Sequence, residues 1–153
     1  MEKDNENIRR IMLAINKIDG VYYLLARHYG INENTLAFFG ALYDGKPHSQ
    51  KQISDEWVIP RTTINSIVKD MRSKGYIEFS AQEHSKEKAL LLTPAGRRYT
   101  GAWMDEIYAA EERAILDTLQ KFSPEFVDAL EYFSSCLQTG LDEIIGKTEK
   151  TES

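Results

Sequence analysis

The chain has 153 residues, of which 42% are hydrophobic and 28% are charged, and its formal net charge at pH 7 is −5. These values are ordinary for a globular protein and fit one compact domain, with or without an extension. No apolar stretch approaches the ~20 residues of a bilayer-spanning helix, and the polar N-terminus argues against a secretory signal. Cys136 is the single cysteine, so no internal disulfide can form and we expect a reducing, cytoplasmic location.

The charge is unevenly distributed along the chain. Ten Lys or Arg and six Asp or Glu lie between Lys46 and Arg98, a net charge of +4, whereas the rest carries nine basic and eighteen acidic residues, a net charge of −9. A basic middle third between acidic ends is typical of a nucleic-acid-reading module on an acidic scaffold, although a charge run is more often a solvated face.

Apolar residues in steps of three and four predict a long first helix from Asn5 to about Tyr29, which Gly30 ends. The apolar stripe consists of Ile8, Ile11, Met12, Ile15, Ile18, Tyr22, Leu25 and Tyr29. This stripe is longer than a small domain can cover, so we expect part of it to pack on a partner. Asn32 is then placed to cap a second helix over Glu33–Tyr43.

A capping box opens the next predicted helix. Ser49 is spaced to cap the amide of Gln52, whose side chain is expected to reach back, and Ile53 and Trp57 are expected to be buried. After a short break, Pro60 suits the first position of another helix, which should end at Gly75.

The helix from Pro60 to Lys74 has a regular apolar face, formed by Ile64, Ile67, Val68 and Met71. Two helices, a three-residue turn and a glycine stop are typical of a helix-turn-helix. Two apolar strands, Tyr76–Phe79 and Ala89–Leu92, follow it, and the polar loop Ser80–Lys88 between them predicts a hairpin.

Two long helices complete the chain. Thr93 and Pro94 begin a helix that runs to Gln120, and Ser123 precedes the last helix, Pro124–Ile145. The last helix carries a nearly heptad-spaced apolar seam, formed by Phe126, Leu130, Phe133, Leu137, Leu141 and Ile144. The polar tail at 146–153 is predicted to be disordered.

Four local motifs, in this order and spacing, resemble the MarR family of bacterial transcriptional regulators. They are Ser49–Ile53, Pro60–Asn65, Lys74–Ile77 and the Leu-Thr-Pro-Ala-Gly junction at Leu92–Gly96. A generic winged helix could supply the first three, so the junction favours this family.

The resemblance implies a mainly α fold with a small β-hairpin wing. A winged helix-turn-helix domain would occupy 32–94, and long N- and C-terminal helices at 5–31 and 95–145 would form a dimerisation region. The implied function is sequence-specific binding of double-stranded DNA at a pseudo-palindromic operator by a homodimer. The alternative is a winged-helix module that binds protein. Such a module would have a neutral or acidic second helix, so the basic residues Arg61 and Lys69 argue against it. The acidic Asp70 in the same helix weakens this argument.

In a helix-turn-helix the second helix enters the major groove, where arginine can read guanine and asparagine can read adenine. The candidate DNA-binding residues are polar and come from both helices and the hairpin: Ser49, Gln50, Lys51, Arg61, Thr62, Thr63, Asn65, Ser66, Lys69, His84, Ser85, Lys86 and Lys88. The competing interpretation is a solvated polar helix face. The sequence leaves open the operator, the regulated genes and whether binding represses or activates.

The hairpin departs from the family pattern. The family usually carries Asp-x-Arg about nine residues before the junction threonine, and this chain has His84, Ser85 and Lys86 there. Lysine carries the same charge as arginine, so the attraction of the hairpin to the DNA backbone should remain. Lysine cannot make the forked, planar contact of arginine, so we do not expect the hairpin to read the minor groove in the usual way.

The resemblance also implies a small aromatic or phenolic effector, held between the dimerisation helices and the DNA-binding lobe. The candidate residues are aromatic: Tyr22, Tyr23, His28, Phe38, Phe39, Tyr43, Trp103 and Tyr108. Aromatic residues at helical spacing are also typical of an ordinary core, so both interpretations stay open.

No residue pattern predicts enzyme, metal or cofactor chemistry. The histidines His28, His48 and His84 are scattered without metal-ligand spacing, and no nucleophile–base pair or Gly-rich phosphate loop occurs. Some family members sense oxidants through a cysteine in the first helix. Cys136 lies in the last helix among apolar neighbours, so we expect a buried, inert thiol.

Overall fold

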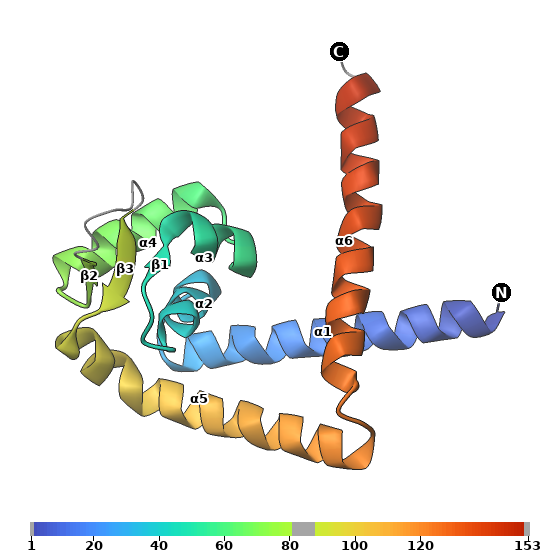
Figure 1. The fold of residues 1–153 in the computed structure, drawn as a ribbon, viewed down its shortest axis with the longest axis horizontal. Helices are drawn as coiled ribbons and strands as arrows, with labels where there is room; N and C mark the ends of the chain where they lie inside the picture. Colours follow the sequence, from blue (N-terminus) through green and yellow to red (C-terminus); the bar gives the residue numbers. More distant parts are fainter. Residues whose placement is uncertain (1, 81–87, 152–153) are drawn as a thin grey trace. The chain divides into compact units, whose positions relative to one another are not determined.

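The computed structural model describes residues 2–80 and 88–151, and over these ranges the chain forms six helices and three short strands (Figure 1). In chain order they are α1 Glu2–His28, α2 Glu33–Leu42, β1 His48–Ser49, α3 Gln50–Trp57, α4 Arg61–Ser73, β2 Ile77–Phe79, β3 Ala89–Leu92, α5 Pro94–Lys121 and α6 Phe126–Thr151. None of the helices described is long and apolar enough to span a membrane.

The contacts divide the chain into two compact units, one up to Asp105 and one from Glu106 onward. The first unit contains α1 to α4, the three strands and the beginning of α5, and its helices α2, α3 and α4 gather with the strands into one lobe (Figure 1). The second unit contains the rest of α5 and all of α6.

The core of the first unit is centred on α2, which contacts α1, α3 and α4. Phe38 and Phe39 of α2 are both 0% exposed. The apolar face of α4 packs on this core, and the buried residues are the predicted ones: Ile64, Ile67, Val68 and Met71.

Three helix boundaries follow the local signals in the sequence. The Asn32 side chain accepts a hydrogen bond from the amide of Thr35 at 2.8 Å, and the Ser49 hydroxyl accepts one from the amide of Gln52 at 3.0 Å. Gly75 ends α4 with a φ of 73°, in the left-handed region that glycine adopts without a steric penalty. These caps confirm where the sequence predicts α2 and α3 to begin and α4 to end.

Two predictions for α3 are wrong. The Gln52 side chain does not reach back to the cap, because its amide donates to the charged carboxylate of Glu56 at 3.0 Å, one turn further along the helix. Trp57 is 45% exposed rather than buried, although part of its indole ring lies close to Gly40 of α2, where an added Cβ would come within 3.2 Å of it.

The turn between α3 and α4 is tightly held, although it contains a strained residue. Val58 is 87% exposed and has a φ of 51°, which a β-branched residue rarely adopts. The buried Ser54 hydroxyl donates to the carbonyl of Ile59 at 2.6 Å. Pro60 is the residue before α4 rather than its first residue, and its carbonyl accepts the first helical hydrogen bond from Ile64 at 3.0 Å.

The sheet has the strand order β1-β3-β2, with antiparallel pairing throughout. Strand β3 covers the predicted residues, and β2 begins at Ile77, one residue later than predicted. Strand β1 is not predicted, because two residues are too short to show an alternating pattern. His48 and Ser49 pair with Leu90 and Ala89, and this pairing joins the start of α3 to the hairpin.

The long terminal helices expose many large hydrophobic side chains in the single chain, although of the predicted α1 stripe only Ile8, Ile11 and Ile18 are exposed and the other five residues are half-buried. In α1 the large exposed hydrophobic residues are Ile8, Ile11, Leu13, Ile18, Val21, Tyr23 and Leu24, and in α6 they are Phe126, Val127, Leu130, Tyr132, Leu137, Leu141, Ile144 and Ile145.

Two predictions for the last helix differ from the structure. Helix α6 extends to Thr151 and so includes most of the segment predicted as a disordered tail. The last apolar residue of the pattern sets the predicted end, and the helical backbone continues beyond it. Cys136 is exposed rather than buried, since its α6 face is not covered within the single chain. Apart from such local differences, the predicted fold class, mainly α with a small β wing, is confirmed.

Candidate nucleic-acid interface

The junction between β3 and α5 is held by Thr93. Its hydroxyl accepts a hydrogen bond from the amide of Gly96 at 3.0 Å and donates one to the carbonyl of Gly75 at 2.6 Å. The Thr93 amide donates to the carbonyl of Tyr76 at 3.0 Å. The Leu-Thr-Pro-Ala-Gly motif therefore ties the start of α5 to the end of α4, and this fixes the hairpin beside α4.

The solvent-facing side of α4 is polar over its whole length. Arg61, Thr62, Asn65, Ser66 and Lys69 are exposed and Thr63 is half-buried. The Ser66 hydroxyl donates to the carbonyl of Thr62 at 3.1 Å, so it keeps lone pairs for a further contact. The structure thus places the six predicted α4 residues away from the buried stripe of that helix.

A cavity of about 340 Å³ lies between the start of α3, the first turns of α4 and the hairpin. It is lined by Ser49, Gln50, Lys51, Arg61, Ile64, Asn65, Phe79 and Lys88. Six of these eight are predicted DNA-binding residues, so the fold gathers groups from β1, α3, α4 and the hairpin around one space. Among the described residues, the lining includes three cations and no carboxylate, which favours an anionic occupant.

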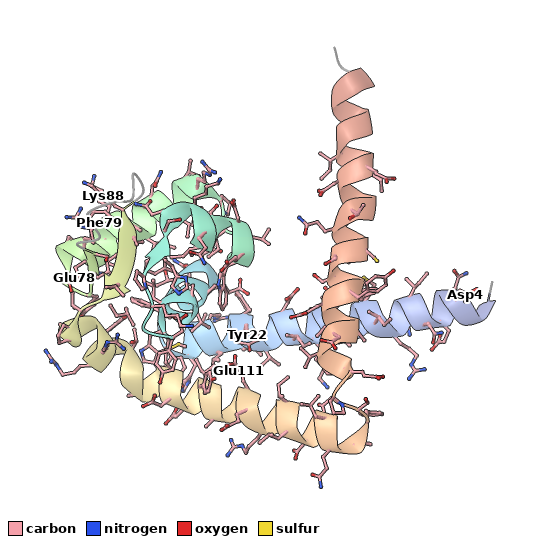
Figure 2. All side chains as sticks on the ribbon, in the orientation of Figure 1. Asp4, Tyr22, Glu78, Phe79, Lys88 and Glu111 are labelled. Carbon is pink, nitrogen blue, oxygen red and sulfur yellow. The ribbon has the colours of Figure 1, made fainter. Side chains whose placement is uncertain are left out.

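Sequence reasoning missed Phe79, which lines this cavity, and Arg72, which packs on the Phe79 ring. The Arg72 guanidinium carbon lies 4.4 Å from the centre of the Phe79 ring, and the Lys88 ammonium nitrogen lies 5.3 Å from it. Figure 2 shows the labelled Phe79 and Lys88 close together at the hairpin. An aromatic residue near the end of one hairpin strand, with a lysine at the start of the other, is the signal that could have indicated this contact.

An Asp–His pair steadies β1 at its beginning. The Asp44 carboxylate accepts hydrogen bonds from the amide of Lys46 at 2.8 Å and from Nε2 of His48 at 2.9 Å. Burial alone would raise the pKa of Asp44, but these two hydrogen bonds hold it below the usual value of 3.8. In the described part of the chain, no group of three or more His, Cys, Asp or Glu residues could hold a metal ion.

The candidate effector residues lie in different environments. Phe38, Phe39 and Trp103 are buried, Tyr22 and Tyr43 are half-buried, and Tyr23, His28 and Tyr108 are exposed. Trp103 packs in an aromatic cluster, with its ring centre 5.8 Å from that of Phe39 and 5.5 Å from that of Tyr29. Tyr43 donates a hydrogen bond to the carboxylate of Asp105. None of the eight lines the cavity beside α4, and the effector site stays a prediction.

Three of the predicted wing residues, His84, Ser85 and Lys86, lie outside the described residues. Lys88 is described, and it lines the cavity beside α4.

The lobe defined by α2, the α3–α4 pair and the hairpin is a winged helix. Residues 29–86 match the model of the MarR family. The fold of nearly the whole chain is similar to that of a MarR family regulator from Neisseria meningitidis, with a TM-score of 0.73 and 20% sequence identity over 93% of this chain and 98% of that one. It is also similar to a MarR/EmrR family transcriptional regulator from Acinetobacter sp. ADP1, with a TM-score of 0.62 and 22% identity over 92% and 97% of the two chains.

No sequence among the curated proteins matches this chain. The solved structures named above show the fold, while the match over the winged-helix segment is one of sequence. Residues 29–86 therefore carry the sequence pattern of the MarR family, and the fold of the chain is similar to that of MarR family regulators.

Proposed function

We propose that the chain is a DNA-binding regulator of transcription that acts as a homodimer in the bacterial cytoplasm. The observation that carries this proposal is the cavity beside α4, whose described lining residues include three cations and no carboxylate and which adjoins an exposed polar helix face. One of the similar structures is that of a MarR family regulator and the other that of a MarR/EmrR family transcriptional regulator, and this supports the same function here.

In this proposal the N-terminal half of α4 enters the major groove. Arg61 and Asn65 are exposed and lie one turn apart, so both side chains can reach base edges, where each bidentate contact contributes about 1–3 kcal/mol of discrimination. Lys51, Lys69 and Lys88 would contact backbone phosphates and set the orientation of the helix.

The uncovered apolar faces support the homodimer. Helices α1 and α6 expose many large hydrophobic side chains, for example Ile8 at 59% and Ile144 at 60%. A second copy of the chain would bury these stripes, and patches of this kind on a single chain are typical of association surfaces. Two recognition helices in a two-fold dimer would lie about 34–36 Å apart, so the operator would be an inverted repeat.

An aromatic or phenolic effector that releases the DNA is a second part of the proposal. The half-buried Tyr22 and Tyr43 are the candidate residues whose rings are neither fully packed nor fully exposed. The buried Phe38, Phe39 and Trp103 would have to move apart to admit a ligand.

Selection of bound duplexes from a random DNA pool tests the proposal directly. We expect the selected sequences to share an inverted repeat whose half-sites are about one helical turn apart. Retention of no duplex at low salt would contradict DNA binding and favour the alternative, a winged-helix module that binds protein.

A further inference from the structure

We propose that Phe79 is a positioning residue, whose ring holds the Lys88 ammonium beside the cavity so that Lys88 contacts a phosphate of the DNA backbone. This inference rests on the proposed DNA-binding function. It adds the residue that orients Lys88, the described cation of the hairpin, through a contact of 5.3 Å with the centre of the ring.

The strand register explains why Lys88 can reach the ring. Phe79 pairs with Leu90, and the amide of Ser80 donates to the carbonyl of Ala89 at 2.7 Å, so the two strands stay in register at this end of the hairpin. Because side chains alternate between the two faces, Lys88 is on the same side of the hairpin as Leu90 and lies diagonal to Phe79.

That side of the hairpin faces the core. Ile77, Leu90 and Leu92 are buried there, at 3%, 0% and 5% exposure, whereas Glu78 on the opposite face is exposed. Lys88 therefore extends from the core-facing side, where the apolar surface ends at the cavity. Figure 2 shows Glu78 lying apart from Phe79 and Lys88.

The ring gathers two cations that would otherwise repel each other. Arg72 and Lys88 lie 4.4 Å and 5.3 Å from the Phe79 centroid, distances at which an aromatic face attracts a cation. Lys51, Arg61 and Lys88 all line the neighbouring cavity, and none of them forms an ion pair with another described residue. An anion between these groups would relieve their mutual repulsion.

The DNA backbone is the source of anion that fits the position of the cavity. Arg61 and Asn65 belong both to the cavity lining and to the exposed polar face of α4. A duplex lying on that face would therefore carry its phosphates past the cavity mouth.

The test compares binding of a labelled, mixed-sequence duplex over a range of salt concentrations for the wild-type chain and the variants Lys88→Gln, Phe79→Leu and Phe79→Tyr. We expect Lys88→Gln to make the log–log salt slope less steep by about 1 for each chain that contacts the DNA. Phe79→Leu should have the same effect, and Phe79→Tyr, which keeps the ring, should bind as the wild type does. The double variant Phe79→Leu/Lys88→Gln should lose no more than Lys88→Gln alone.

The controls separate positioning from folding and from net charge. Lys121→Gln removes the same charge from an exposed lysine that also lies over a phenylalanine ring, that of Phe122 at 5.5 Å, but at the end of α5, and it should leave the slope nearly unchanged. Ring-current shifts of the Lys88 side-chain protons, measured by NMR without DNA, should be present in the wild type and in Phe79→Tyr. If Phe79→Leu does not fold, absence of these shifts in those two proteins would overturn the positioning role.

Each remaining outcome has a defined meaning. An unchanged salt slope in folded Phe79→Leu, or additive losses in the double variant, would contradict this inference while the DNA-binding function stands. Saturable displacement of the duplex by millimolar inorganic phosphate, but not by chloride at equal ionic strength, would assign the cavity to a free phosphate compound instead. No binding of duplex by the wild type would contradict the proposed function itself.

Discussion

The α carbon of Gly96 lies against the carbonyl oxygen of Tyr76 so closely that a Cβ at position 96 would overlap it, and would lie 2.9 Å from the carbonyl carbon. The same carbonyl accepts the hydrogen bond from the amide of Thr93 at 3.0 Å. The first turn of α5 is therefore packed directly onto the backbone that follows α4, and a side chain at position 96 would force the two apart.

Gly96→Ala should destabilise the chain by about 1–3 kcal/mol, because the backbone on which the new methyl group would press has little freedom to move. Chemical denaturation measures this. Gly101→Ala in the same helix is the matched control, since a Cβ there meets nothing within 4 Å, and it should raise stability by up to ~1 kcal/mol through better helix propensity. Equal effects of the two substitutions would contradict the close packing at Gly96.

Val58→Gly should stabilise the fold, although it removes an apolar side chain. Val58 is 87% exposed and has a φ of 51°, so its side chain gains little from burial while its backbone bears a left-handed penalty of about 1–2 kcal/mol. Part of this gain is offset by the greater freedom of glycine in the unfolded chain. Thermal melting should show a higher midpoint for Val58→Gly than for wild type, with Val58→Ala between them. A lower midpoint for the glycine variant would contradict backbone strain at Val58.

The Asp44–His48 contact predicts a pH dependence of stability. Since the pKa of folded Asp44 lies below the usual 3.8, its ionised form stabilises the fold fully above that value, and the stabilisation is lost as the pH falls through 3.8 and then through the lower folded pKa. Asp44→Asn should therefore be less stable than wild type at neutral pH. The difference should be modest because the carboxylate is 43% exposed, and it should shrink in acid. Urea denaturation of both proteins at neutral and at acidic pH tests this. A stability difference that does not change with pH would show that the charge of the Asp44 carboxylate is not its cause.

Association through the terminal helices predicts a dimer in solution. Sedimentation at micromolar concentration should give about twice the chain mass of 17.6 kDa. Truncation after Ser123 removes α6 and its share of the association surface, and should give an aggregated or unfolded product. A stable monomer of the full chain would contradict the homodimer.

Features with a local physical cause could be predicted from the sequence. The buried stripe of α4 follows from helical periodicity, and the ends of α2 to α4 follow from the side chains of Asn32 and Ser49 and from the positive φ at Gly75. The polar residues of α4 follow from the same periodicity, because the positions outside the apolar stripe must face solvent.

Features that depend on tertiary contacts could not be predicted in this way. The exposure of Trp57 depends on which helix faces it, and the side-chain choice of Gln52 depends on the acceptor at Glu56. The exposure of Cys136 depends on what covers α6, which the pattern of one helix does not specify. The contact between Phe79 and Arg72 joins a strand to a helix, and no spacing along the chain encodes it.

The salt dependence of binding to a selected duplex tests the central claim, that a dimer of this chain binds DNA through α3, α4 and the wing. Lys51, Lys69, Lys86 and Lys88 give about four phosphate contacts per chain, hence roughly eight per dimer, and counterion release then predicts a log–log slope near −7. The acidic remainder of the chain should make the slope shallower without abolishing it. A steep negative slope is the result that we predict, and a slope indistinguishable from zero would mean that the basic middle third binds another partner.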